Sequence, residues 1–501
     1  MIRNRQKVAA ADDGDALSPE IWRISFVVVL GSIMSILDTT IVNVALQTLG
    51  RELDSTLADI QWVVTGYMLA LAAVIPLTGW TARRLGAKRV YVTTLILFTA
   101  SSALCGLAWS TGSLIAFRVL QGAAGGMLLP IGQLMMAEAA GPKQMGRVMS
   151  IVGVPMMLAP IFGPTVGGLI VDHLSWRWIF FVNVPFGILA VVAALRVLPA
   201  GPRGAVDPLD VRGLVLLTLG VPLVTYGLAE VGETGGFTGP RVLVPTIVGT
   251  TLVVLFVLHA LRTRFPLLDV RLYRRPTFSS ASFAMFSLGA ALMGGMILLP
   301  LYWQDVRGES ATATGLLTAP QGLGMALFMP LSGKLTDRYG GGPLALFGVT
   351  LTAVTTIPFG LIGPDTSVLG LSVAMFLRGI GMAFAFMPAM AAAFASLDRA
   401  DLPHATPQLN VLQRVGGSIG TAVLAVVLQR ALSGAETPAD QASAYGTAFW
   451  VSAGLAAAAI VPCVVLLRAE RAARADGPPP PVTPPPPSSP EAVPFAEPVT
   501  R

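Results

Sequence analysis

The sequence predicts an all-α polytopic membrane protein with 14 transmembrane helices, arranged as two six-helix bundles with two extra central helices. Three observations support this fold class. The 501 residues are 54% hydrophobic and only 12% charged, whereas an average soluble domain is about 25% charged. Apolar stretches of about 20 residues, the length that crosses a bilayer, recur from Ile24 to Arg468. Two segments of the first half of the chain return in the second half.

The apolar stretches that are long enough to cross a membrane number 14. The predicted spans are residues 24–46, 60–81, 89–108, 112–137, 146–171, 178–198, 211–229, 242–261, 277–303, 312–333, 343–362, 366–395, 406–429 and 446–467. The seventh and eighth spans fall between the two repeated halves and form the extra pair.

The positions of the basic residues orient the chain. With the N-terminus inside, 25 of the 33 Lys and Arg residues fall in cytoplasmic segments, five in outer segments and three within spans. Cytoplasmic loops of membrane proteins carry such an excess of Lys and Arg. We therefore expect a multi-pass protein of the cell (inner or plasma) membrane with both termini in the cytoplasm. Because the loops account for the basic residues, the net charge of +6 does not indicate nucleic-acid binding.

Two segments occur twice in the chain. PLTGWTARRLG (76–86) matches PLSGKLTDRYG (330–340) without a gap, and FRVLQGAAGGMLLP (117–130) resembles LRGIGMAFAFMP (377–388). The second pair brings an arginine to equivalent points of the fourth and twelfth spans. Internal repeats with a binding site at their interface are typical of secondary transporters.

The repeat divides the chain into five predicted segments. They are a cytoplasmic N-terminal segment at 1–23, an N-terminal six-helix bundle at 24–200, a two-helix insert with an inner loop at 201–275, a C-terminal six-helix bundle at 276–468 and a disordered cytoplasmic tail at 469–501. The tail contains PPPPVTPPPPSSP, a composition that favours polyproline or disordered chain.

The residues that would carry metal or enzymatic chemistry are sparse and scattered. Cys105 and Cys463 each lie in an apolar stretch, where a thiol packs as a small hydrophobic group. The histidines, His173, His259 and His404, show no metal-ligand spacing, and no GxxxxGK[ST] loop for ATP is present. We expect no metal site, no cofactor and no enzymatic activity. Because the chain has no ATP-binding loop of its own, energy for its function would come from a gradient or from a separate subunit.

Asp38 is the only charged residue between Ile24 and Leu46. At 100° per residue it belongs to a polar stripe that covers an arc of about 140° of the first span. The members of the stripe are Ser32, Ser35, Asp38, Thr39 and Asn43. Because a charge is costly in lipid, the stripe should face protein or water.

Arg118 lies at a similar depth in the fourth span. Asp38 is about eight residues from the outer end of its span and Arg118 about six residues into its own, so both lie ~9–12 Å below the outer end. If the two spans line one cavity, as the family resemblance given below implies, the two side chains are expected to meet or to share a water. Such a carboxylate can take up a proton on one side of the membrane and release it on the other. A cationic substrate would compete with the proton for it.

Seven segments resemble motifs of one transporter family. They are LDTTIVNVAL (37–46), GWTARRLGAKR (79–89), LIAFRVLQGAAGG (114–126), GVPMMLAPIFGPTVGG (153–168), WRWIFFVNVPFG (176–187), GKLTDRYG (333–340) and NVLQRVGGSIG (410–420). In this order they resemble the major facilitator superfamily, specifically its fourteen-span drug:proton antiporters of the EmrB/QacA type. The sequence departs from the family pattern at Gln47, where Pro is usual, and at Arg83, where an acid is usual.

The resemblance implies the major facilitator fold with a central cavity lined by spans 1 and 4. The expected proton-coupling residues are Asp38 and Arg118. The polar residues expected at the substrate cavity are Asn43, Gln133, Gln321, Asn410, Gln413, Arg414 and Arg378. The residues expected to govern conformational gating are Gly79, Arg83, Arg84, Gly86, Gly163, Pro164, Gly167, Gly168, Gly333, Asp337 and Arg338. Helix–helix hydrogen bonds and close helix packing are the alternative roles for these polar residues and glycines.

The resemblance also predicts the function. It implies a proton-coupled multidrug efflux antiporter that exports amphipathic, often cationic, compounds by alternating access and confers antibiotic resistance. The alternative is a dedicated exporter of an endogenous metabolite, antibiotic or lipid. The expected partners are small-molecule drugs or metabolites, protons and the lipid bilayer, with no nucleic acid. The protein is expected to act as a monomer, and the sequence leaves open whether an adaptor subunit extends the export path.

Overall fold

The computed structural model describes residues 17–199 and 207–475, which form helices joined by short loops and contain no strand. The remaining residues hold most of the predicted N-terminal segment and Pro-rich tail, so these predictions lie outside the described residues. The N-terminal half consists of α1 (Pro19–Glu52), α2 (Leu57–Val74), α3 (Thr78–Leu85), α4 (Ala87–Gly106), α5 (Thr111–Ala140), α6 (Met145–His173), α7 (Trp178–Phe181) and α8 (Asn183–Val197). The insert consists of α9 (Val211–Thr234) and α10 (Pro240–Arg262). The C-terminal half consists of α11 (Pro276–Leu301), α12 (Ala311–Tyr339), α13 (Gly341–Thr356), α14 (Val368–Ala395), α15 (Leu402–Leu432), α16 (Pro438–Ala458) and α17 (Ile460–Ala475).

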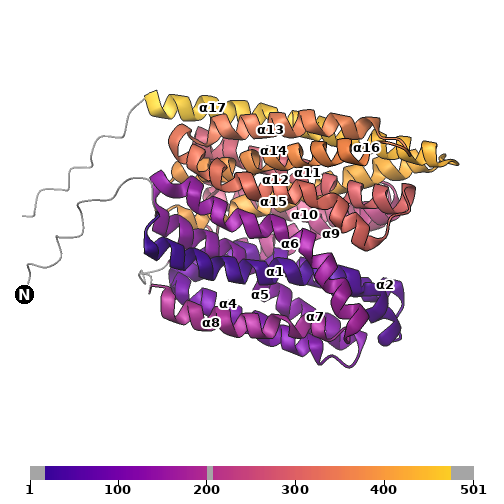
Figure 1. The fold of residues 1–501 in the computed structure, drawn as a ribbon. Helices are drawn as coiled ribbons and strands as arrows, with labels where there is room; N and C mark the ends of the chain where they lie inside the picture. The colour runs from indigo at the N-terminus through magenta and orange to yellow at the C-terminus, as the bar shows by residue number, and fades with distance from the viewer. Residues whose placement is uncertain (1–16, 200–206, 476–501) are drawn as a thin grey trace, which may run out of the picture.

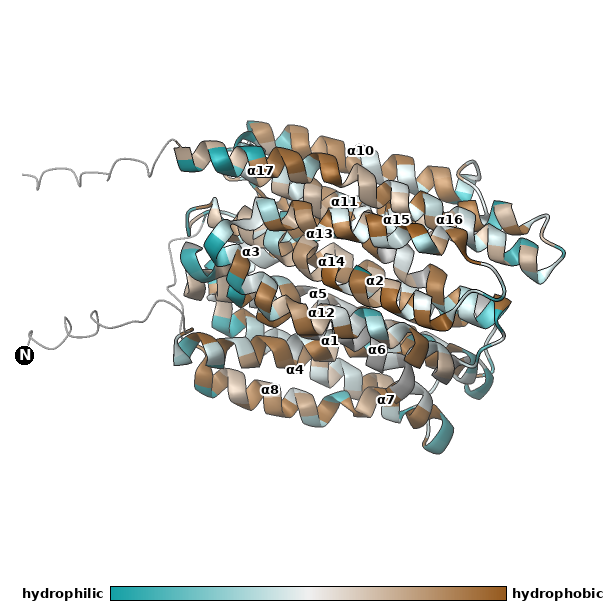
Figure 2. Ribbon diagram, turned by 45° about the horizontal axis from the view of Figure 1, so that its top comes forward, coloured by the Kyte–Doolittle hydropathy of each residue, from teal (hydrophilic) through white to brown (hydrophobic). Residues whose placement is uncertain are grey.

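The helices have the length and composition of membrane spans. Eleven stretches of the described residues are long and apolar enough to cross a membrane. Three further helices, α6, α11 and α12, have 29, 26 and 29 residues and coincide with the predicted fifth, ninth and tenth spans. Figure 2 shows hydrophobic residues along the middle of the helices and hydrophilic residues gathered at the two ends of the bundle. The chain is therefore a multi-pass membrane protein, and the count of fourteen spans stays a prediction.

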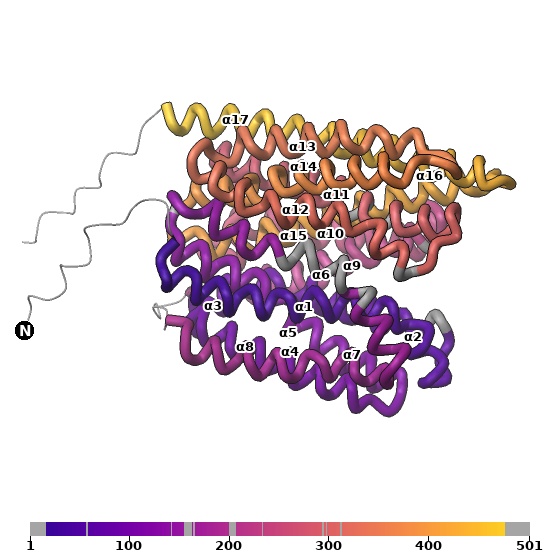
Figure 3. The backbone as a smooth tube through the Cα atoms, in the orientation of Figure 1, coloured from indigo at the N-terminus to yellow at the C-terminus, as the bar shows by residue number. Residues whose placement is uncertain are grey.

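The start of α1 and the end of α17 lie at the same end of the bundle (Figure 1). We call this the terminus end; it is the end predicted to be cytoplasmic. Figure 3 shows the N-terminal half (indigo to magenta) and the C-terminal half (orange to yellow) as two blocks of roughly parallel helices side by side.

The repeated sequence segments fold alike. Each ends at a glycine with positive φ, 86° at Gly86 and 96° at Gly340. These glycines turn the chain directly from α3 into α4 and from α12 into α13. Residues with a side chain rarely adopt this backbone conformation. The repeat in the sequence therefore marks one sharp helix–turn–helix connection that the fold uses twice.

The insert contacts both halves. Helix α9 packs against α2 on one side and α15 on the other. Thr218 on α9 donates a hydrogen bond to the carbonyl oxygen of Ala73 at 3.2 Å, and Tyr226 stacks on Trp62 of α2 with 6.0 Å between ring centroids. Helix α9 therefore covers the boundary between the halves along this side, and α10 packs against α9.

The last helix continues further than the sequence predicted. Residues 469–475 were assigned to the disordered tail, but they belong to α17, which runs to Ala475. Glu470 explains the extension, because its carboxylate accepts hydrogen bonds from the backbone N–H groups of Gly341 at 3.1 Å and Gly342 at 2.8 Å. These N–H groups open α13 and have no partner within their own helix. The start of α13 and the end of α17 thus stabilise each other.

Candidate functional site

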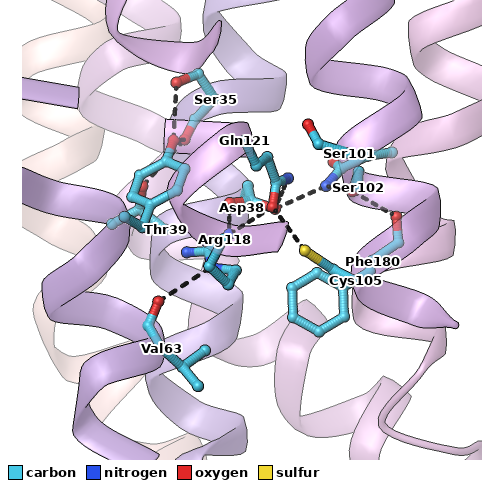
Figure 4. Close-up of polar contacts among 12 residues, drawn as sticks. Ser35, Asp38, Thr39, Val63, Ser101, Ser102, Cys105, Arg118, Gln121 and Phe180 are labelled. Carbon is cyan, nitrogen blue, oxygen red and sulfur yellow. Dashed lines mark hydrogen bonds and ion pairs between the residues drawn. The ribbon is translucent and has the colours of Figure 1, made fainter. Parts of the chain in front are cut away.

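Asp38 lies near the middle of α1 with no exposed surface. Arg118 Nη1 on α5 is 2.5 Å from one carboxylate oxygen of Asp38. The other oxygen accepts hydrogen bonds from Gln121 Nε2 at 2.7 Å and from Asn183 Nδ2 at 2.9 Å. Figure 4 shows Asp38, Arg118 and Gln121 converging at this point. The predicted contact between Asp38 and Arg118 is confirmed, whereas their role in proton coupling stays a prediction.

The guanidinium of Arg118 is held on several sides. Its Nε donates to the carbonyl oxygen of Val63 at 3.2 Å and its Nη1 to Gln121 Oε1 at 2.8 Å. The ring of Tyr67 lies 4.0 Å from its Cζ atom and the ring of Phe180 lies 5.7 Å away. Nη2 has no hydrogen-bond partner among the described residues. The cation therefore rests on aromatic faces and keeps one amino group for a further acceptor.

Two amides of this cluster, Gln121 and Asn183, were not among the predicted site residues. Gln121 accepts from the Cys105 thiol at 3.4 Å, and Asn183 also donates to Ser102 Oγ at 3.1 Å. A signal for Gln121 was present, because it follows Arg118 by three residues and so lies on the same helix face. Asn183 lies inside the segment WRWIFFVNVPFG, whose sequence alone does not show which residue meets Asp38. Together the amides fix the carboxylate between α1, α5 and α8.

The polar stripe of the first span is only partly buried. Ser32 and Ser35 are buried like Asp38, and Ser35 Oγ lies 3.3 Å from the hydroxyl of Tyr67 on α2. Asn43 is exposed and has no hydrogen bond to any described residue. Asn43 lies more than one turn beyond Asp38, so it does not belong to the cluster.

A second group of contacts joins the two halves at the terminus end. Asp337 at the end of α12 accepts hydrogen bonds from the backbone N–H of Gly146 and from Arg147 Nε, both at 2.7 Å. A side chain on Gly333 would come within 2.9 Å of the carbonyl oxygen of Gly146. These glycines therefore let α6 and α12 meet backbone to backbone, and Asp337 fastens the contact with a charged hydrogen bond.

The predicted loop residue Arg83 also crosses the boundary. Its Nη1 donates to Nε2 of His404 at the start of α15, at 2.7 Å. Nearby, a side chain on Gly79 would collide with the carbonyl oxygen of Pro403. Arg84 and Arg338, also predicted to gate, are exposed. The close contact between α3 and α15 therefore depends on Arg83 and on Gly79.

Deeper in the bundle, the halves meet through amides. Asn410 on α15 donates to Gln133 on α5 at 2.8 Å, and Gln133 Nε2 lies 3.6 Å from the sulfur of Met390. Gln321 stays within the C-terminal half, 3.6 Å from the sulfur of Met382. The polar contacts described between the halves thus lie on the side of the terminus end, which closes the boundary there.

The glycines of the fifth predicted span differ in their surroundings. A side chain on Gly163 would collide with Thr40 of α1, and one on Gly167 would lie 3.2 Å from the backbone of Ile41. Gly168 has nothing within 4 Å, so the prediction of a close helix approach there is wrong. Gly168 follows Gly167 by 100° around the helix and turns away from α1. The side chain of Pro164 lies outside the described residues.

The described residues contain no group of three or more His, Cys, Asp and Glu residues that could hold a metal ion. The polar groups at the centre of the molecule are instead one ion pair, several amides and two further arginines, Arg378 and Arg414. This arrangement can bind protons and polar ligand groups.

Comparison with known proteins identifies the family. Residues 28–421 match the model of the Major Facilitator Superfamily. The chain belongs to the major facilitator superfamily. The multidrug resistance protein B homolog of Mycobacterium tuberculosis is 39% identical over 417 residues, which cover 83% of this chain and 77% of that protein. The multidrug export protein EmrB of Haemophilus influenzae is 31% identical over 399 residues, which cover 79% and 78%.

A solved structure shows the same fold. The proton:xylose symporter XylE superposes with a TM-score of 0.62 at 14% identity, covering 88% of this chain and 94% of that one. The major facilitator fold predicted from the motifs is therefore confirmed. Together with the names of the relatives, it makes this chain a major facilitator transporter related to multidrug export proteins.

Proposed function

We propose that this protein is a proton-coupled antiporter that exports amphipathic compounds by alternating access. The observation that carries the proposal is the ion pair of Asp38 and Arg118, both 0% exposed in their side chains. A buried ion pair is a weak source of stability, because apolar residues of similar volume often serve as well or better. Its presence between two spans therefore supports a functional role, and ionisable groups inside membrane proteins commonly mark proton pathways.

Protonation of Asp38 would change the packing of the N-terminal half. Each polar contact of its carboxylate comes from a donor: Arg118, Gln121 or Asn183. The arrangement therefore suits the ionised form. A proton on Asp38 would remove the charge that holds Arg118 and would place a donor against a donor. The guanidinium would then move, and the link between α1 and α5 would loosen.

Alternating access requires the seal at the terminus end to open. The polar contacts of Asp337 with α6 and of Arg83 with His404 would have to break. The apolar packing of Met149 on α6 in one core with Met329 on α12 would have to separate with them. The names of the relatives, which are multidrug resistance and export proteins, support drugs as substrates. We propose further that the protein transports rather than catalyses, that it works as a monomer without a cofactor, and that both termini are cytoplasmic.

Proton movement that is induced by a substrate tests this function. The purified protein is reconstituted in liposomes that contain a pH-sensitive dye, and a panel of amphipathic dyes and drugs is added. We expect several compounds to cause proton flux opposite to their own movement, and liposomes without protein to show none. If no compound changes the internal pH, the antiport proposal is wrong and a dedicated or uncoupled exporter becomes the better account.

A further inference from the structure

Arg414 lies on the face of α15 that meets the N-terminal half. Asn410, one helical turn earlier on the same face, donates across the boundary to Gln133 at 2.8 Å. The Arg414 side chain is partly accessible. It therefore lies where the two halves face each other, one helical turn beyond the contact of Asn410 with Gln133.

Among the residues that the structure describes, none is a counter-ion for the guanidinium of Arg414. The ion pairs among the described residues involve other basic side chains, and no described residue accepts a hydrogen bond from Arg414. An arginine carries five N–H donors, and a charge at membrane depth normally has a partner. Arg414 thus has donors to offer to a ligand in this space.

Arg378, also in the C-terminal half, likewise has N–H donors without acceptors among the described residues. It is 1% exposed, and its Nε and Nη1 have no hydrogen-bond partner among the described residues. It is the repeat equivalent of Arg118, yet the residue against its guanidinium is Gly295 of α11, whereas Arg118 faces Asp38 of α1. The C-terminal half therefore holds two arginines without a carboxylate, and the carboxylate of the N-terminal half is already paired.

We propose that Arg414 binds the acidic group of the exported compound, so that the preferred substrates are amphipathic organic acids in their ionised form. This inference rests on the proposed function and names its substrate class. A carboxylate or related group can accept two parallel hydrogen bonds from one guanidinium and supplies the missing counter-ion. The expectation of cationic substrates depended on a free carboxylate at Asp38. Asp38 already has three donors, and unpaired arginines repel a cation.

The proton and the acid would then use different residues. Asp38 on α1 belongs to the N-terminal half, and Arg414 on α15 belongs to the C-terminal half. An acid that leaves in exchange for an entering proton moves two positive charges inward. A membrane potential that is negative inside should therefore speed the export of the acid.

A matched set of probes tests the inference. Three compounds share one naphthalene ring and alkyl chain and end in a carboxylate, a primary amide or an ammonium group. Their equilibrium binding is measured on the full-length protein in nanodiscs of zwitterionic lipid. The variants are Arg414→Gln, Arg414→Lys and, as a control, Arg430→Gln at the exposed far end of the same helix.

The carboxylate should bind the wild type about ten- to a hundredfold more tightly than the amide, as expected for a charged hydrogen bond, and the ammonium compound should bind most weakly. Arg414→Gln should abolish the preference, Arg414→Lys should keep part of it, and Arg430→Gln should leave it unchanged. Equal binding of the three probes, or a preference that survives Arg414→Gln, overturns the inference. If Arg414→Gln does not fold, the order of the probes on the wild type and on Arg414→Lys still decides.

Two further arms separate this inference from other questions. Addition of an anionic lipid to the nanodiscs shows whether a lipid displaces the carboxylate probe; displacement identifies a membrane lipid as the acid, and its absence identifies a soluble amphiphile. Both results support the site. Binding does not require proton coupling. A carboxylate preference without proton flux therefore contradicts only the proposed antiport, whereas proton flux without that preference contradicts only the role of Arg414.

Discussion

Replacing one member of the buried ion pair should destabilise the protein much more than replacing both. Arg118→Gln leaves Asp38 buried without its counter-ion, with two amide donors, Gln121 and Asn183, in place of three contacts. Asp38→Asn leaves Arg118 buried with hydrogen bonds to Val63 and Gln121 only. Removal of one partner from such a pair costs about 3–5 kcal/mol.

The double variant is the informative member of this series. Asp38→Asn combined with Arg118→Gln removes both charges, and the four amides can pair among themselves. We expect it to lose no more stability than either single variant, which corresponds to a coupling energy of about 3 kcal/mol or more.

Reversible unfolding in mixed micelles, followed by tryptophan fluorescence, measures these losses. Arg275 and Asp398 provide a control pair, because their contact is long at 3.5 Å and their side chains are 42% and 83% exposed. The same cycle on this pair should give a coupling of less than about 1 kcal/mol. Additive losses at Asp38 and Arg118 would refute the view that the two charges depend on each other.

Three further substitutions test other parts of the account. Gly163→Ala should lower the stability of the fold by about 1–3 kcal/mol, because the added methyl group meets Thr40. Gly168→Ala should change the stability by less than about 0.5 kcal/mol. Thermal unfolding measures both, and equal effects would contradict the packing of α6 described above. Asp337→Asn should weaken the seal at the terminus end by about 1.5–3 kcal/mol, seen as longer distances between spin labels on α6 and α12; unchanged distances would show that the seal does not depend on this carboxylate.

The fold could be predicted from the sequence because membrane spans are long and apolar and are separated by loops whose basic residues indicate the orientation. The contact of Asp38 with Arg118 was predictable from their matching depth together with the family resemblance, which places spans 1 and 4 at one cavity. Both helices start or end at the same surface and rise by a fixed distance per residue, so counting residues gives depth.

The features that the sequence did not reveal depend on how helices turn and cross. Gln121 and Asn183 are neutral amides, whose role follows from the rotation of α5 and α8 toward Asp38. Gly168 shares a motif with Gly167 but faces another way, and residues 469–475 became helical because Glu470 meets the start of α13. Each of these depends on contacts between segments far apart in the chain.

Asp38→Asn in proteoliposomes tests the central claim most directly. The variant is compared with the wild type for export of one substrate under an imposed proton gradient, after both have been shown to be folded and equally inserted. We predict that the proton gradient drives substrate export by the wild type. The variant should not respond to the gradient and should only move the substrate down the substrate's own concentration gradient. Full proton-driven export by Asp38→Asn would contradict the claim that this carboxylate couples the proton to transport.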